Sequence, residues 1–190
     1  MGIKGLSKYI KQSGVKGAST LSLKDLRGWK VAVDASIYLY RYLAQDDLIT
    51  LLYSMVSVLQ SHGVELLFVF DGKPPPEKLK TLAQRRKQRT DARAELAQLE
   101  GIEGDSFDPR VRSTRIQRLK RQCVRLTDED IGSAKTLIDL MGVNHLVADG
   151  EAEALCAKLV QCRCVDAVLS DDTDMFIYGV GRVLRYLSLI

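Results

Sequence analysis

The sequence has little histidine and no cysteine pattern typical of a metal-binding finger. No two of its four cysteines form a CxxC pair, and its two histidines are not spaced as zinc ligands; they are Cys123, Cys156, Cys162, Cys164, His62 and His145. These absences argue against a structural zinc site. We interpret the cysteines as reduced thiols.

Long apolar runs are also missing, so no segment is long enough to span a membrane. The N-terminus lacks a signal-peptide pattern, and Leu6 stands where a myristoylation motif needs Ser or Thr. We expect no membrane partner and an intracellular protein, nuclear if its source is eukaryotic. The 190 residues, 46% of them hydrophobic, suit one domain over 1–190 and a monomer.

Charge is distributed unevenly along the chain. Residues 1–72 have a balance of +2, residues 73–125 have +8 from fifteen Lys/Arg against seven Asp/Glu, and residues 126–190 have −6. A basic middle followed by an acidic end indicates an anionic partner and a cation site in one molecule.

Short apolar runs alternate with helical patterns. The runs typical of buried strands are 29–35, 65–71, 142–148, 164–170 and 182–189. Helical patterns cover 46–62, which ends at Gly63, 128–141, which begins after Thr127 as its N-cap, and 151–161. This alternation predicts an α/β fold with a mostly parallel central sheet and helices on both faces.

The basic segment at about 73–126 interrupts the alternation. After three prolines, a long polar helix should run from Pro76 to about Leu99, followed by a loop at 100–109 and a second basic segment at 110–125. Neither half has a full apolar stripe, so we expect the pair to project from the sheet.

Acidic residues follow four of the predicted strands. They are Asp34, Asp71, the pair Glu151 and Glu153, and the group Asp171, Asp172 and Asp174. Because parallel strands end at the same edge of a sheet, these acids should lie together there. A single Asp after a strand is usually a turn or cap residue, and we interpret Asp149 and Asp171 in that way. The argument therefore depends on the conjunction of four strand ends.

Clustered carboxylates raise one another's pKa values or require a cation. Oxygen ligands without His or Cys favour Mg²⁺, with Mn²⁺ as a substitute. Six acids exceed the need of one ion, so two ions about 3.5–4 Å apart are expected. Such a pair can activate water and stabilise the leaving oxygen of a phosphoryl displacement. An EF-hand beginning at Asp171 is excluded, since Phe176 and Arg182 occupy its sixth and twelfth positions.

Five motifs together resemble the flap endonuclease family, within the structure-specific 5′ nucleases related to xeroderma pigmentosum group G. They are MGIKGL at the N-terminus, VAVDASIYLY at 31–40, VFDGKPP at 69–75, DGEAEA at 149–154 and SDDTDMFIYG at 170–179. The resemblance covers essentially the whole chain. It implies a PIN-like fold with an inserted basic helical arch, two divalent metals and cleavage of DNA at 5′ single-stranded flaps or branches, in replication or repair.

Carried over by position, the resemblance assigns the metal ligands to Asp34, Asp71, Glu151, Glu153, Asp172 and Asp174. It assigns Lys78 and Arg85 to the scissile phosphate, and seven residues in a helix would place them roughly 10 Å apart on one face. It also implies nucleic-acid contacts by Gly2, by Tyr40 through stacking on a base, and by arch residues such as Lys73, Arg86 and Arg89. Without the resemblance, a solvated basic face would explain Lys78 and Arg85 equally well, and a core or surface tyrosine would explain Tyr40 better than base stacking does.

Two family features have no match before Ile190: an Asp in a Gly-Ser-Asp-Tyr context and the helix–two-turn–helix module that grips duplex DNA. The sequence also gives no support for binding to a sliding clamp. We keep two alternatives to a DNA 5′ nuclease: an RNA-directed PIN-like nuclease, and a nucleic-acid-binding scaffold with impaired catalysis. The intact set of six acids argues against the scaffold.

Overall fold

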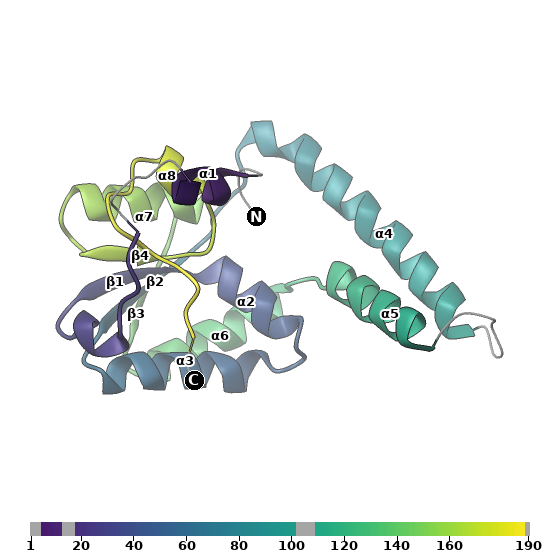
Figure 1. Cartoon of the computed structure of the whole chain (residues 1–190), viewed down its shortest axis with the longest axis horizontal. Helices are drawn as coiled ribbons and strands as arrows, with labels where there is room; N and C mark the ends of the chain where they lie inside the picture. The colour runs from purple at the N-terminus through teal and green to yellow at the C-terminus, as the bar shows by residue number, and fades with distance from the viewer. Residues whose placement is uncertain (1–4, 13–17, 102–108, 189–190) are drawn as a thin grey trace.

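A five-stranded parallel sheet forms the centre of the protein in the computed structural model, which describes residues 5–12, 18–101 and 109–188 (Figure 1). The strand order is β3–β2–β1–β4–β5, and every pair is parallel. The strands are β1 (Lys30–Asp34), β2 (Glu65–Phe70), β3 (Asn144–Val147), β4 (Ala167–Leu169) and β5 (Val183–Leu184). This arrangement confirms the predicted α/β class.

Helices cover both faces of the sheet. On one face lie α2 (Ala35–Leu43), α3 (Leu48–Ser61) and α6 (Asp128–Leu140); on the other lie α7 (Ala152–Gln161) and the short α8 (Asp174–Ile177). Alternate strand residues divide between the two layers, as the period of a strand requires. Val33 and Phe68 pack in the α2–α3–α6 layer, whereas Ala32 and Val69 pack against α7.

The helix ends that the sequence predicted are confirmed. Helix α3 ends at Ser61, and Gly63 has a φ of +76°. The amides of Gly63 and Val64 donate to the carbonyls of Gln60 and Leu59 at 2.8 and 3.1 Å, which is the Schellman pattern. Thr127 caps α6 in a reciprocal capping box with Asp130.

Other parts differ from the sequence analysis. Helix α2, α1 (Leu6–Gln12) and the 3₁₀ turn η1 (Leu23–Leu26) were not predicted, and β5 has two residues where a strand over 182–189 was predicted. The strand stops early because Tyr186 has a φ of +57° and its amide donates to Asp171 Oδ1 at 2.7 Å, which turns the chain away from the sheet.

Between β2 and α6, two helices lie side by side and extend away from the sheet (Figure 1). They are α4 (Leu79–Gly101) and α5 (Pro109–Cys123), and we call this pair the basic hairpin. Its projection agrees with the predicted arch, although most of the predicted loop at 100–109 lies outside the described residues. Lys78 belongs to the 3₁₀ turn η2 (Pro76–Lys78), so the prediction that it shares one α-helix with Arg85 is wrong.

None of the helices in the described ranges combines the length and apolarity needed to cross a membrane.

Candidate active site

Four neighbouring strands deliver acidic residues to one edge of the sheet. Asp34 is the last residue of β1, and Asp71 follows β2 directly. Beyond β3, Glu151 is the N-cap of α7 and Glu153 lies in its first turn. Asp172 follows β4, and Asp174 begins α8. All strands are parallel, so these carboxyl ends meet at the same edge.

Gly72 allows two of these loops to approach each other. A Cβ at this position would lie 1.8 Å from the carbonyl oxygen of Ala148, far inside any permitted contact. The amide of Gly72 donates to the carbonyl of Gly150 at 2.8 Å. This close contact holds Asp71 beside the start of α7, where Glu151 lies.

Asp34 and Asp172 are the most buried of these acids, each with 3% of its surface exposed. Burial raises the pKa of Asp34 to about 7, although a hydrogen bond of 3.0 Å from Ser170 Oγ acts in the opposite direction. The negative charges of Glu153, Asp71 and Asp172 raise it further. Asp34 is therefore an acid that its neighbours make difficult to ionise.

The same mutual repulsion acts on Glu153. Burial raises the pKa of Glu153 first, the charge of Lys78 lowers it, and the nearby acids Asp71, Glu151 and Asp172 raise it again. These effects place Asp34, Asp71, Glu151, Glu153 and Asp172 in one electrostatic group, which we call the acidic edge. Asp174 is connected to it through its amide, which donates to Asp172 Oδ1 at 3.0 Å.

Asp71 caps a helix that is distant in the sequence. Its Oδ1 accepts the amide of Ala152 at 2.9 Å, and its Oδ2 accepts Ser36 Oγ at 2.5 Å. A carboxylate at the start of α7 is favoured by the exposed amides and the dipole of the helix. The side chain of Glu151, the N-cap residue itself, makes no capping bond.

The Glu151 carboxylate binds two other side chains. Lys78 Nζ forms an ion pair with Oε1, and the Tyr178 hydroxyl donates to Oε2 at 3.1 Å. Partial burial lowers the pKa of Lys78, but the bond to Glu151 and the charge of Glu153 raise it above its ordinary value. Lys78 therefore stays charged at the acidic edge, at the base of the basic hairpin.

Asp171 has a different environment, as the sequence analysis expected. Its carboxylate accepts Arg41 Nη2 in an ion pair and the amide of Tyr186, and its carbonyl accepts Arg185 Nη2 at 2.6 Å. These bonds connect the loop after β4 to α2 and to the segment after β5. Asp171 thus has a structural role.

Within residues 5–12, 18–101 and 109–188, no three acidic, histidine or cysteine side chains already converge as a metal site. The acids bind serine, lysine, tyrosine and amide donors instead. The donor set nevertheless fits a hard divalent cation, because every candidate ligand is a carboxylate oxygen and a cation would offset the repulsion that raises the pKa values of Asp34 and Glu153. The assignment of individual metal ligands stays a prediction.

Two family descriptions match most of the chain: residues 1–92 match the XPG N-terminal domain, and residues 142–189 match the XPG I-region. The chain carries both of these XPG domains. Flap endonuclease 1 of Drosophila yakuba is 35% identical over 204 residues, covering 99% of this chain and 50% of the relative. The chain thus spans about half the length of this curated relative.

Solved structures of this kind share the fold. The catalytic core of Rad2 in complex with DNA substrate has a TM-score of 0.67 at 25% identity, over 97% of this chain and 49% of that one. The Holliday junction-resolving enzyme GEN1 in complex with product DNA and a Mg²⁺ ion has a TM-score of 0.60 at 27% identity, over 97% and 36%. Both XPG domains of this chain therefore form the expected PIN-like fold.

The first XPG domain contains most of the predicted nucleic-acid contacts. Gly2 lies outside the described residues. Tyr40 is 40% exposed on α2. Lys73 is exposed in the loop before η2, Arg85 and Arg86 are exposed on α4, and Arg89 is half-buried there. None of these contacts is tested by the structure, so they stay predictions.

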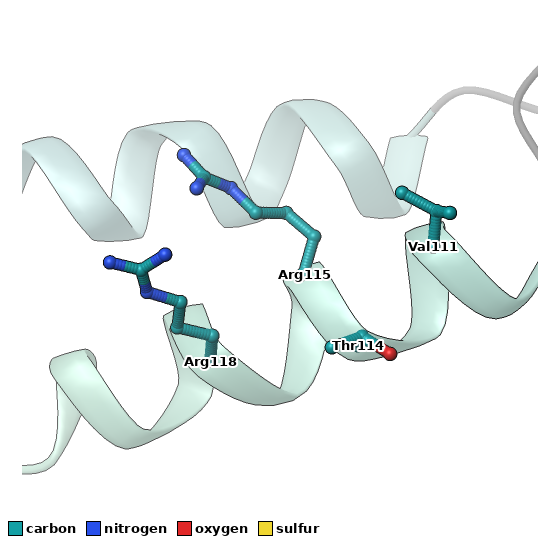
Figure 2. Close-up of a pocket in the computed structure, with 4 residues that line it drawn as sticks. All are labelled: Val111, Thr114, Arg115 and Arg118. Atoms are coloured by element: carbon teal, nitrogen blue, oxygen red, sulfur yellow. The ribbon is translucent and has the colours of Figure 1, made fainter.

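The basic hairpin begins within the first XPG domain, and its second helix, α5, lies between the two domains. Few of its residues are buried, among them Ala92 on α4 and Leu119 on α5. An open hollow on it is lined by Val111, Thr114, Arg115 and Arg118 (Figure 2). Figure 2 shows Arg115 and Arg118 extending from α5 toward α4. Arg115 forms an ion pair with Glu95 on α4, and both side chains are more than 40% exposed. The hollow is thus an open depression in the charged surface of the two helices.

Sequence reasoning missed the residues that orient the acids. Ser36 binds Asp71, Ser170 binds Asp34, and Tyr178 binds Glu151. All three lie within the motifs DASIYLY and SDDTDMFIYG that signalled the XPG resemblance. Their partners are 27 to 136 residues away, so spacing alone gave no indication of the pairs.

Proposed function

We propose that this chain is the nuclease domain of a structure-specific 5′ nuclease that hydrolyses DNA with the help of two divalent cations. The single observation that carries this proposal is the ion pair between Lys78 and Glu151. It joins the base of the basic hairpin to the acidic edge, so a phosphate-binding cation lies beside a candidate cation site. The DNA in the Rad2 and GEN1 structures supports a DNA substrate.

In this proposal, Lys78 binds the scissile phosphate and offsets the charge that develops on it. Its side chain is 47% exposed, so a phosphate can reach it from solvent. Arg85 follows on α4 and provides a second positive charge for the same strand. Cations beside a reacting phosphate stabilise the negative charge that develops on it in the transition state.

The metal ligands in this proposal are Asp34, Asp71, Glu151, Glu153, Asp172 and Asp174. Two bound Mg²⁺ or Mn²⁺ ions would supply Lewis-acid chemistry at the phosphate and activate water. The chain itself contributes the orientation of the acids: Ser170 holds Asp34, and the start of α7 holds Asp71. Cations would relieve the repulsion within the acidic edge and so stabilise the fold.

The basic hairpin binds the single strand of a 5′ flap or branch. Fifteen Lys/Arg in residues 73–125 favour phosphate contacts that do not depend on base sequence and that weaken with salt. Tyr40 offers an exposed ring on which a base can stack.

The test incubates the protein and its Asp172→Ala variant with Mg²⁺, or with Mn²⁺, and labelled 5′-flap DNA, hairpin DNA or single-stranded RNA. We expect cleavage of the flap and its loss in the variant. Cleavage of RNA alone would favour the RNA-directed nuclease. Binding of DNA without cleavage with either ion, together with no Mn²⁺ binding by calorimetry, would favour the scaffold.

A further inference from the structure

The side chain of Glu151 does not cap α7, although Glu151 is the N-cap residue, because Asp71 accepts an amide at the start of the helix in its place. As the N-cap of α7, Glu151 has extended backbone angles, φ −85° and ψ 137°, but makes no capping bond. Asp71 Oδ1 accepts the amide of Ala152 instead. Among the described residues, the donors to the Glu151 carboxylate, which is 17% exposed, are two side chains.

Two donors hold it, one on each oxygen. Lys78 binds Oε1, and the hydroxyl of Tyr178 binds Oε2 at 3.1 Å. The two donors differ in what else they can do. Lys78 is a flexible, half-exposed cation at the base of the basic hairpin, and phosphate competes for it. Tyr178 is neutral, so an approaching phosphate competes with its bond to Glu151 much less strongly.

The backbone of Tyr178 is fixed on both sides. Its amide donates to the carbonyl of Asp174 at 3.2 Å, which closes α8. Its carbonyl accepts Gln161 Nε2 at 3.1 Å, which ties it to the end of α7. Glu151 begins the same helix, so the hydroxyl of Tyr178 is anchored to the element that carries its partner.

We infer that Tyr178 is a positioning residue that keeps Glu151 directed at the cation site when Lys78 turns from Glu151 to the substrate phosphate. This inference rests on the proposed function. Lys78 orients Glu151 in the free protein and leaves it when DNA binds, whereas Tyr178 holds Oε2 throughout. Without the hydroxyl, no residue in the described part of the chain holds Glu151 after Lys78 has moved, and Glu151 becomes a poorer cation ligand.

The test compares Tyr178→Phe with wild type and with Tyr53→Phe. Tyr53 is an exposed tyrosine on α3, on the opposite face of the sheet from α7 and α8, so its variant controls for the loss of a hydroxyl. We expect Tyr178→Phe to weaken Mn²⁺ binding by about 10-fold in calorimetry, the size usual for residues that orient metal ligands. The Mg²⁺ concentration for half-maximal cleavage should rise similarly, while kcat at saturating Mg²⁺ changes less than about threefold.

The Lys78→Ala variant separates the contributions of the two donors to Mn²⁺ binding. In Lys78→Ala, Glu151 keeps Tyr178 as its hydrogen-bond donor, so adding Tyr178→Phe should weaken Mn²⁺ binding more than it does in wild type. Equal Mn²⁺ affinity of Tyr178→Phe and wild type would overturn the inference. So would a loss of kcat with unchanged metal dependence.

A third measurement needs neither metal nor activity. Urea unfolding of metal-free Tyr178→Phe, Glu151→Ala and the double variant should show non-additive changes in the unfolding equilibrium, because the two residues share a bond. Additive changes would contradict the contact. If wild type binds no Mn²⁺, the proposed function is wrong, and this cycle alone then decides whether Tyr178 holds Glu151.

Discussion

The acidic edge and the basic hairpin hold their charges in opposite ways. At the acidic edge, Asp34 and Asp172 are buried, Glu151 and Glu153 are half-buried and Asp71 is exposed. Serine, lysine, tyrosine and amide donors fix the directions of Asp34, Asp71 and Glu151. On the basic hairpin, most cations are exposed on a helix pair with few buried residues. This difference suits two tasks: chemistry needs fixed positions, whereas binding a flexible strand needs charge density. Each prediction below tests one side of the contrast.

The largest effect should come from Gly72→Ala, which forces the loop after β2 away from the loop before α7. Its Cβ would lie 1.8 Å from the carbonyl oxygen of Ala148, and backbone on both sides leaves little room to adjust. We expect a loss of more than about 3 kcal/mol in the free energy of unfolding by urea. Gly132→Ala on α6, where a Cβ meets nothing within 4 Å, should instead be neutral or stabilising by up to about 1 kcal/mol. Equal stability of the two variants would show that the loops at Gly72 can separate freely.

Lys78→Ala should be next, because it removes the cation that joins the acidic edge to the basic hairpin. Loss of one preorganised charge at a reacting phosphate typically lowers kcat by about 10²–10³-fold. Steady-state cleavage of flap DNA would measure this. Lys80→Ala, which removes an exposed charge two residues further along, should change kcat less than about threefold. Similar losses in both variants would indicate that hairpin charge in general, and not the position of Lys78, is what matters.

Much of this contrast could be predicted from the sequence. Apolar runs followed by acids predicted which strand ends would meet, and the excess of Lys/Arg without an apolar stripe predicted the projecting helices. Local signals such as Gly63 and Thr127 predicted helix ends because a turn or cap depends on a few adjacent residues.

The pairings at the site could not be predicted in the same way. Asp71 caps a helix that begins 81 residues later, and Ser170 binds an acid 136 residues earlier. Such bonds depend on which strands lie next to each other in the sheet, and the spacing of residues along the sequence does not give that order. The short β5 was missed for a similar reason, since the bond between Asp171 and the amide of Tyr186 ends the strand.

Asp34→Asn should show how much the negative charge of a buried carboxylate destabilises the acidic edge, because it removes the charge and keeps a side chain of similar size. The folded pKa of about 7 exceeds the ordinary value of 3.8, so the folded protein holds a proton that the unfolded chain releases, and its stability falls as pH rises from about 4 to 7. At pH 8, without divalent cations, the variant should be more stable than wild type by about 2–4 kcal/mol, and the difference should vanish near pH 4.

Urea titrations at several pH values would measure this difference. Asp47→Asn, at an exposed residue whose side chain makes no capping bond, is the matched control and should show no such advantage. Addition of Mg²⁺ should reduce the advantage of Asp34→Asn, because a cation stabilises the ionised carboxylates. A variant less stable than wild type at pH 8 would contradict the raised pKa.

On the basic hairpin, Arg86→Ala combined with Arg89→Ala should weaken binding of single-stranded DNA by about 10-fold and leave Mn²⁺ affinity unchanged. Each lost phosphate contact should reduce the slope of log affinity against log salt by about 0.7, so the double variant should lose about 1.4. Fluorescence anisotropy over a salt series would measure both quantities. Lys158→Ala, which removes a charge from α7, should leave the slope unaltered; a uniform effect of every lost cation would mean that net charge alone attracts the DNA.

The smallest effect should follow the loss of the ion pair within the basic hairpin itself. Arg115 binds Glu95 through two nitrogens, yet both side chains are more than 40% exposed, and exposed pairs contribute less than about 1 kcal/mol. Arg115→Ala should therefore change the free energy of unfolding by less than about 0.5 kcal/mol in urea. Leu119→Ala on the same helix removes a buried side chain, 2% exposed, and should cost about 2 kcal/mol or more. If Arg115→Ala proved as costly as Leu119→Ala, salt bridges would hold the basic hairpin together, and the contrast with the acidic edge, where polar bonds fix side-chain direction, would disappear.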